Sequence, residues 1–174
     1  MKTYGQYVWA GDGDDLVDFG DSWYGTYGYG GQGNDTFNLP IRGVFNTVRG
    51  GDGDDHFMTD KDYGRTDAAG PPSTIVTIYG DAGNDKMELD PYFRSQLVYG
   101  YGGTGDDKII YPHNASTLIA GEDGDDIIYG DSPDDGTPFG GVQAIYGDEL
   151  TSAITADASL ATVGGDDKLY GSDF

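Results

Sequence analysis

A glycine-rich turn that ends in Asp-Asp or Asn-Asp recurs seven times along this chain. The clearest copies occupy residues 30–35, 50–55 and 102–107, and each is followed by one variable residue and then an apolar one. The first positions of the seven turns are residues 10, 30, 50, 80, 102, 121 and 147, so the steps are 20, 20, 30, 22, 19 and 26 residues. Such a period indicates a solenoid, in which each repeat packs against its neighbours.

Short apolar patterns on both sides of each turn predict two strands per coil. The second residue after the turn is apolar in every copy: Val17, Phe37, Phe57, Met87, Ile109, Ile128 and Leu169. The segment before the turn contributes a second apolar set: Val8, Val48, Ile78, Ile119 and Ile145. Alternation with one buried face is typical of strands. We therefore predict an all-β solenoid of about seven coils, with two facing sheets and a thin core.

The connections between coils are irregular, whereas the turns are not. The linkers at residues 60–73, 90–96 and 132–140 differ in length and hold most of the prolines. We expect one regular edge of glycine-rich turns and an opposite edge of variable loops. The seventh turn opens at residue 147, but its expected ending is displaced to residues 165–169, so we expect an insertion near 149–164. A chain of 174 residues suits a single domain spanning 1–174.

Composition restricts the partners that such a chain can have. The net charge is −22 and the sequence pI is about 4.1, which argues against nucleic acid or an anionic membrane as a partner. Hydrophobic residues make up 36% and there is no cysteine, so neither a large core nor a disulfide framework is available. Low hydrophobicity with high charge predicts disorder unless a cation neutralises the carboxylates. We find no apolar run long enough to span a membrane.

The residue types in the turn point to calcium. Glycine at turn positions 1, 2 and 4 permits positive φ and a tight turn that directs backbone carbonyls inward, and Asp at position 6 adds an anionic oxygen. Calcium takes six to eight oxygen ligands in flexible geometry, which two turns stacked about 4.8 Å apart can supply together. Zinc and copper are disfavoured because the chain has no cysteine and two histidines, and magnesium fits carbonyl-rich sites poorly.

The nonapeptide Gly-Gly-X-Gly-X-Asp-X-apolar-X resembles the calcium-binding repeat of the repeats-in-toxin (RTX) family of secreted bacterial proteins. The resemblance covers nearly the whole chain and implies a right-handed parallel β-roll with about six bound calcium ions. Here one edge qualifies for metal turns, whereas family members usually have them on both. Carried over by position, the carboxylate ligands are Asp15, Asp35, Asp55, Asp85, Asp107, Asp126 and Asp167. Backbone carbonyl ligands from positions 3 and 5 are those of Asp12, Asp14, Gln32, Asn34, Asp52, Asp54, Ala82, Asn84, Thr104, Asp106, Asp123 and Asp125.

The resemblance also implies a biological setting. RTX chains stay unfolded in a low-calcium cytoplasm and fold after export, so we expect a secreted protein, free or at the cell surface. Two roles are compatible with this pattern. One is a structural, adhesive or self-assembling β-roll, and the alternative is the C-terminal accessory or secretion module of a larger secreted enzyme or toxin.

Motifs for other chemistry carry little weight. Residues 28–33 and 100–105 match the dinucleotide fingerprint G-x-G-x-x-G, but the calcium turn generates this match and no strand–helix unit surrounds it. We find neither a zinc-protease motif nor a nucleophile elbow. The carboxylate pairs repeat with every coil, unlike a catalytic pair. We therefore expect no enzymatic activity.

The residue immediately before each turn forms another repeating position. It is aromatic in five of seven copies: Trp9, Tyr29, Tyr79, Tyr101 and Tyr146. The register places these side chains outward in one stripe. Two interpretations remain open: ladder packing between coils, or a docking strip for sugar rings or another protein.

The two ends of the chain raise a question of assembly. The chain begins in a strand-like segment and stops just after another, and solenoids need polar caps or a neighbour over their terminal coils. Two expectations follow. Either the chain is a fragment of a larger protein, or it self-associates head to tail through uncapped ends.

Overall fold

The computed structural model describes residues 6–19, 25–39, 45–59, 75–89, 97–112, 116–131, 143–147 and 168–170. Within these ranges the chain forms strands and turns. The strands are β1 (Gln6–Asp12), β2 (Leu16–Asp18), β3 (Thr26–Gln32), β4 (Thr36–Leu39), β5 (Phe45–Asp52), β6 (His56–Thr59), β7 (Ile75–Ala82), β8 (Lys86–Glu88), β9 (Leu97–Thr104), β10 (Lys108–Pro112), β11 (Ser116–Asp123), β12 (Ile127–Asp131), β13 (Gln143–Tyr146) and β14 (Lys168–Tyr170).

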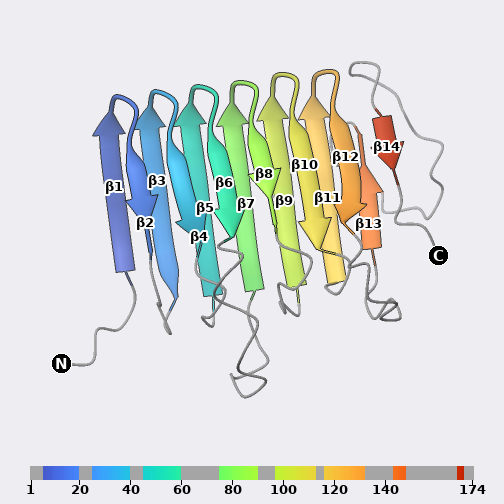
Figure 1. The fold of residues 1–174 in the computed structure, drawn as a ribbon, viewed down its shortest axis with the longest axis horizontal. Coiled ribbons are helices and arrows are strands. Elements are labelled where there is room, and N and C mark those ends of the chain that lie inside the picture. Colours follow the sequence, from blue (N-terminus) through green and yellow to red (C-terminus); the bar gives the residue numbers. More distant parts are fainter. Residues whose placement is uncertain are drawn as a thin grey trace.

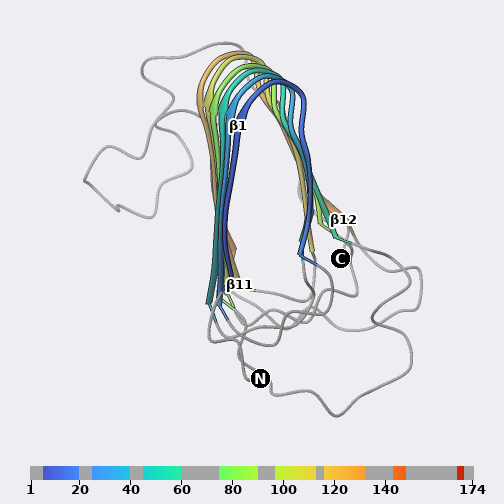
Figure 2. The ribbon, with the colours of Figure 1, turned by 90° about the vertical axis from the view of Figure 1, so that its left-hand side faces the viewer.

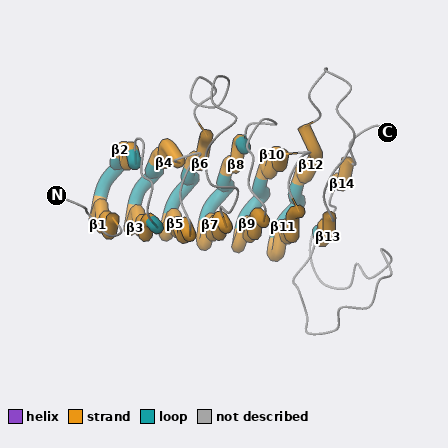
Figure 3. The backbone as a smooth tube through the Cα atoms, turned by 90° about the horizontal axis from the view of Figure 1, so that it is seen from below, coloured by secondary structure: helices purple, strands orange, loops and turns teal. Residues whose placement is uncertain are grey.

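These strands form two parallel sheets that face each other. The odd-numbered strands make one sheet in the order β1-β3-β5-β7-β9-β11-β13, and the even-numbered strands make the other in the order β14-β12-β10-β8-β6-β4-β2. We call them the odd sheet and the even sheet. Figures 1 and 2 show them as two walls joined by stacked, tight turns at one end. Seen from below, the two rows of strands run side by side along the same axis (Figure 3). The prediction of an all-β parallel solenoid is confirmed.

Each coil pairs with the next in the register that the glycine pattern predicts. Across the odd sheet, Trp9 pairs with Tyr29, Tyr29 with Arg49, and Arg49 with Tyr79. The step from Arg49 to Tyr79 is longer than the two before it, yet the pairing stays in register. The linkers that differ in length therefore leave the turn-bearing ends of the strands aligned.

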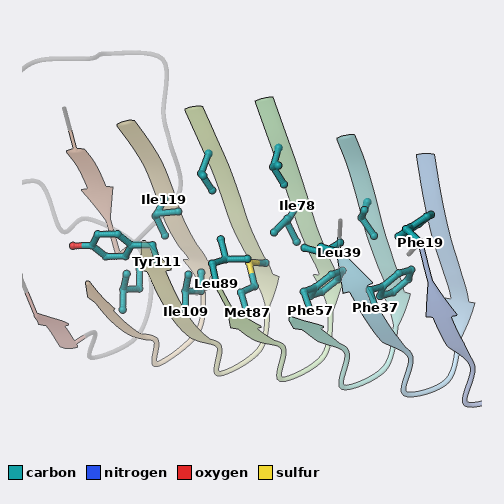
Figure 4. Close-up of a cluster of buried hydrophobic side chains, with 14 of the residues drawn as sticks. Phe19, Phe37, Leu39, Phe57, Ile78, Met87, Leu89, Ile109, Tyr111 and Ile119 are labelled. Atoms are coloured by element: carbon teal, nitrogen blue, oxygen red, sulfur yellow. The ribbon is translucent and has the colours of Figure 1, made fainter. Parts of the chain in front are cut away.

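A narrow apolar core fills the space between the sheets. The predicted residues Val17, Phe37, Phe57, Met87, Ile109 and Ile128 of the even sheet are all buried. Opposite them, Val48, Ile78 and Ile119 of the odd sheet are also buried, and Val8 and Ile145 pack partly buried against the same core. Successive side chains stack along the axis, as Figure 4 shows for Phe37 and Phe57, whose ring centroids lie 5.0 Å apart at an interplanar angle of 5°.

A second core layer lies farther from the turns, and the sequence patterns did not predict it. Phe19, Leu39, Leu89 and Tyr111 point inward from the ends of the even-sheet strands or just beyond them, as Figure 4 shows. They face Val76 and Val98, together with the buried polar residues Thr26, Asn46 and Thr117, in the odd sheet. The Thr26 hydroxyl donates to Asn46 Oδ1 at 2.7 Å. This layer deepens the core at the edge that the sequence shows as irregular.

Two glycines interrupt the inward row of the odd sheet for a packing reason. A Cβ on Gly28 would lie 2.7 Å from Phe19 Cζ, and a Cβ on Gly100 would lie 2.9 Å from Ile119 Cδ1. Large side chains of adjacent coils therefore occupy the space that a side chain at these positions would need.

Several predictions fall outside the described residues. The expected insertion near 149–164, Asp167, most of the variable linkers and the side chain of Leu169 lie there, and the single-domain assignment stays a prediction. In the described part of the chain, no helix is long and apolar enough to cross a membrane.

Candidate metal centre in the glycine-rich turns

The turns that connect the two sheets share one backbone conformation. In all six turns that the structure describes fully, positions 2 and 4 have positive φ, for example 127° at Gly31 and 122° at Gly33. Positive φ favours glycine because it has no Cβ. Asp81 and Glu122 replace glycine at position 2 and still adopt φ of 81° and 78°. The stacking of turns therefore imposes this conformation even on residues that resist it.

The position 6 aspartates form a buried ladder. One carboxylate oxygen, Oδ1, accepts a hydrogen bond from the backbone N–H of the position 6 aspartate in the preceding turn. The Asp35 N–H donates to Asp55 Oδ1 at 2.7 Å, and the Asp55 N–H donates to Asp85 Oδ1 at 2.7 Å. Asp35, Asp55, Asp85, Asp107 and Asp126 are each at most 2% exposed. The chain thus stacks carboxylates along its axis, away from water.

The second oxygen of these carboxylates marks the candidate metal site. Oδ2 of Asp35, Asp55, Asp85 and Asp107 is buried and has no hydrogen-bond partner. A buried acceptor without a partner is costly, and a buried charge is more so. Because the unpaired oxygen recurs in successive turns, it indicates that each Oδ2 has an electropositive partner that the protein itself does not provide.

The glycine at turn position 1 leaves room for this oxygen. A Cβ on Gly50 would overlap Asp55 Oδ2 and would lie 2.7 Å from the carbonyl oxygen of Gly80 in the next turn. The same pair of oxygens recurs at Gly30, Gly80, Gly102 and Gly121. Each of these glycines therefore borders a space that a carboxylate oxygen and a carbonyl oxygen face together.

Further carbonyls face the same gaps between turns. A Cβ on Gly51 would overlap the carbonyl oxygen of Gly31, and a Cβ on Gly33 would lie 2.5 Å from the carbonyl oxygen of Gly13. Carbonyls of positions 2 and 4 thus point toward the following turn, whereas the carbonyl of position 1 points back. An all-oxygen lining with one buried carboxylate per turn fits a hard cation such as calcium.

The protonation chemistry of these carboxylates fits a cation beside Oδ2. Burial, together with the neighbouring carboxylates of the ladder, raises the pKa of Asp55 and Asp85 to about 7 and that of Asp107 to about 8. The backbone N–H donors offset part of this increase. Burial likewise raises the pKa of Asp35. A divalent cation beside Oδ2 would reverse these shifts because it favours the ionised form.

Comparison with known proteins agrees with this chemistry. A family model described as RTX calcium-binding nonapeptide repeat (4 copies) matches residues 45–63, 76–90 and 118–135. The chain carries RTX calcium-binding repeats. The matched segments contain the turns at 50–55, 80–85 and 121–126, and the turns at 10–15, 30–35 and 102–107 stack on them in the same register. Neither a curated protein nor a solved structure matches the chain.

RTX repeats bind calcium, and here side-chain carboxylates alone would not complete the sites. In the described residues, no three side chains of His, Cys, Asp or Glu gather into a group that could hold a metal ion. The position 6 aspartates are spaced one per turn along the axis, so backbone carbonyls have to supply the remaining protein ligands.

The predicted carbonyl ligands of position 3 have a structural role in the RTX turns. The carbonyl of Gln32 accepts from the Gly13 N–H at 2.6 Å, and that of Asp52 accepts from the Gly33 N–H at 2.8 Å. The carbonyls of Ala82, Thr104 and Asp123 accept in the same way. A carbonyl oxygen has two lone pairs, so each keeps one for a metal. Metal coordination by these carbonyls stays a prediction.

Position 5 acts through its side chain, which the sequence analysis missed. Asp14 Oδ1 accepts from the Asn34 N–H at 2.8 Å, and Asn34 Oδ1 accepts from the Asp54 N–H at 2.8 Å. Asp54, Asn84 and Asp106 accept in the same way from the turn that follows. This exposed ladder reaches forward along the chain, whereas the buried position 6 ladder reaches back. The free choice between Asp and Asn at position 5 was the available signal, because both carry the Oδ1 acceptor.

The aromatic stripe packs as a ladder. Tyr79 and Tyr101 stack at 5.0 Å between ring centroids with an interplanar angle of 9°, and Trp9 meets Tyr29 edge to face at 5.1 Å. Ala120 and Tyr146 continue the row in register. Stacking directs the ring faces of Tyr79 and Tyr101 along the axis toward each other, so less of each face is open to an external ligand. Docking of a sugar or a protein on this stripe stays a prediction.

Proposed function

We propose that this protein is an extracellular, non-enzymatic β-roll that folds as calcium binds its RTX turns. The proposed arrangement has about seven right-handed coils, one edge of calcium turns, an opposite edge of variable loops, and about six ions between successive turns. The observation that carries the proposal is the row of buried Oδ2 atoms at Asp35, Asp55, Asp85 and Asp107, each without a hydrogen-bond partner. Their position beside backbone carbonyls supports calcium over a purely polar core.

Coupling between binding and folding follows from the same residues. Without a cation, the fold has to bury carboxylates that repel one another in register, and the thin core offers limited compensation. Calcium binding would supply the missing charge, so its binding energy becomes folding energy. Export of an unfolded chain by type I secretion, followed by folding outside the cell, is consistent with this coupling. The folded rod would then serve a structural, adhesive or self-assembling role.

A circular dichroism titration tests the calcium proposal. Calcium should produce a steep gain of β signal, whereas magnesium at the same concentration should not. Asp55→Asn keeps the Oδ1 acceptor but removes the buried charge, so it should raise the calcium concentration at the midpoint several-fold. Asp18→Asn, an equal change of net charge on an exposed position of β2, serves as the control. Full β structure in a strong chelator at neutral pH would contradict the proposal.

The self-assembling role has a separate test. Light scattering on the calcium-loaded protein should report a particle size that rises with protein concentration and falls when calcium is chelated. A size that stays monomeric over the accessible concentration range would remove self-assembly from the proposal and leave calcium binding untouched.

A further inference from the structure

The outer face of the odd sheet has a hollow over one glycine of the turn edge. Asp81, Gly103 and Glu122 pair in register on neighbouring strands β7, β9 and β11. Because Gly103 has no side chain, the two acidic residues flank an opening of about 300 Å³. In the described residues, Asp81 and Glu122 are also the two positions other than glycine with positive φ. The chain thus tolerates backbone strain at both walls of this hollow.

The remaining walls give the hollow its chemical character. Tyr79 and Tyr101 line the side away from the turn, and Asp123 lines the turn side. Three carboxylates beside the Tyr101 ring, in a chain of net charge −22, favour a cation that also packs against an aromatic side chain. Arginine combines both properties, because its guanidinium is planar, weakly hydrated and able to pair with carboxylates in a bidentate manner.

The protein itself shows this binding mode on the other side of β7. The guanidinium of Arg49 lies 5.0 Å from the ring centroid of Tyr79. Arg49 Nε donates to Asp81 Oδ2 at 3.0 Å, and Nη2 pairs with Asp81 Oδ1. Thus Tyr79 and Asp81, which form one wall of the hollow, already hold a guanidinium contributed by β5. A carboxylate has about four acceptor sites, so this pairing leaves Asp81 able to accept again.

We propose that the hollow over Gly103 binds an arginine side chain of a partner polypeptide. The guanidinium would lie between the carboxylates of Asp81 and Glu122 and beside Tyr101, because Arg49 and Tyr101 already cover the two faces of the Tyr79 ring. A second calcium site is a weaker assignment, because the described residues contain no group of three acidic side chains with metal-binding geometry. Lysine is a poorer occupant, since its ammonium is compact, strongly hydrated and unable to form the bidentate pair.

The test is an NMR titration of the calcium-loaded protein with three blocked Gly-X-Gly tripeptides, in which X is arginine, lysine or citrulline. The arginine peptide should shift the amide resonances of Gly103 and Glu122, and the neutral citrulline peptide should not. Glu122→Gln keeps the size of the side chain and should weaken arginine binding about tenfold, the cost of one charge-assisted hydrogen bond. Asp18→Asn removes the same charge far from the hollow and should leave binding unchanged.

Other outcomes would overturn the proposal. Equal binding of lysine and arginine peptides, or equal loss in Glu122→Gln and Asp18→Asn, would reduce the effect to general charge attraction. Displacement of the peptide by one further equivalent of calcium would make the hollow a metal site. Free arginine that binds as tightly as the blocked peptide would point to a small molecule instead of a polypeptide. The calcium-dependent circular dichroism signal, measured in parallel on each variant, shows whether the fold itself is intact.

Discussion

The glycines at turn positions 2 and 4 meet two separate constraints. One constraint comes from their own backbone, because φ is positive in every described turn. The other comes from the preceding turn, whose carbonyl oxygen occupies the place of a Cβ, as the Gly31 carbonyl does at Gly51. Gly11 lacks the second constraint, since no described atom lies within 4 Å of its Cβ position. A single residue type thus serves both the turn and the stacking.

Because Gly11 lacks the second constraint, replacing glycine by alanine should lower the free energy of unfolding less at position 11 than at position 51. Gly51→Ala and Gly11→Ala both place a Cβ at φ near 120°. Gly51→Ala also forces the carbonyl of Gly31 away, so it should lower the free energy of unfolding by at least about 1 kcal/mol more than Gly11→Ala. Urea unfolding in saturating calcium measures both variants. Equal costs would mean that the backbone conformation alone selects glycine here.

Replacing Glu122 by glycine should have the opposite effect and stabilise the fold, because Glu122 has positive φ. Glu122→Gly removes the positive-φ strain of a residue with a Cβ and should raise the free energy of unfolding by about 0.5–1 kcal/mol, after the entropy that glycine adds to the unfolded chain. Glu122→Ala is the matched control, because it removes the carboxylate and keeps the strain. Thermal unfolding in saturating calcium distinguishes the two, and a gain in both variants would assign the cost to charge repulsion instead.

At the scale of the element, the turn is a pair of side-chain ladders that run in opposite directions. The position 5 side chains reach forward to the next N–H, and the position 6 side chains reach back to the previous one. Every turn is therefore tied to its neighbours through acceptors that either Asp or Asn provides. The buried ladder also carries an electrostatic cost, because its neighbouring carboxylates raise one another's pKa.

The sign of the pH dependence follows from the buried ladder. The folded-state pKa of Asp55 and Asp85 is about 7 and that of Asp107 about 8, above the ordinary value of 3.8. The metal-free folded state therefore binds more protons than the unfolded state, and its stability should fall as the pH rises from about 4 to about 8. In a chelator, circular dichroism should report more β structure at pH 5 than at pH 8.

Calcium should change the dependence of stability on pH, because protons and the cation compete for the same carboxylates. Below pH 7 the calcium affinity of the folded chain should therefore weaken, and the calcium concentration at the folding midpoint should fall, because protons already stabilise the folded state. Asp85→Asn removes one titrating group, so the slope of stability against pH in chelator should decrease. A chelated chain that becomes more structured as the pH rises would show that these carboxylates are not the groups that oppose folding.

At the scale of the whole molecule, the parallel solenoid makes each coil depend on its two neighbours. The coils at residues 30–49 and 50–59 keep the same register as those before and after them, for example Tyr29 with Arg49. Stability is then close to a sum over coils and the interfaces between them. This additivity distinguishes the protein from a globular domain, in which one removed segment opens the whole core.

Deletion of one whole coil tests this organisation. Removal of residues 30–49 joins Tyr29 to Gly50, so every turn position stays in register, and Gly28 still leaves space for Phe19. The shortened chain should fold with calcium and lose part of its stability. Removal of residues 30–39, half a coil, is the control and should lose more of the calcium-induced β signal than the whole-coil deletion, because it places a strand where a turn has to stack. Similar signals from both deletions would contradict the nearest-neighbour description.

The sequence by itself determined the parallel solenoid, the position of the turns and the first core layer. These features repeat locally, since glycine sets the backbone of each turn and the apolar residue two positions later faces the core. The tertiary structure alone decided the second core layer with Phe19 and Tyr111, the opposite directions of the two ladders, and the hollow between Asp81 and Glu122. Each of these depends on which way the side chains of paired coils point and what they contact, and the repeat pattern predicts the pairing of the turns without predicting those contacts.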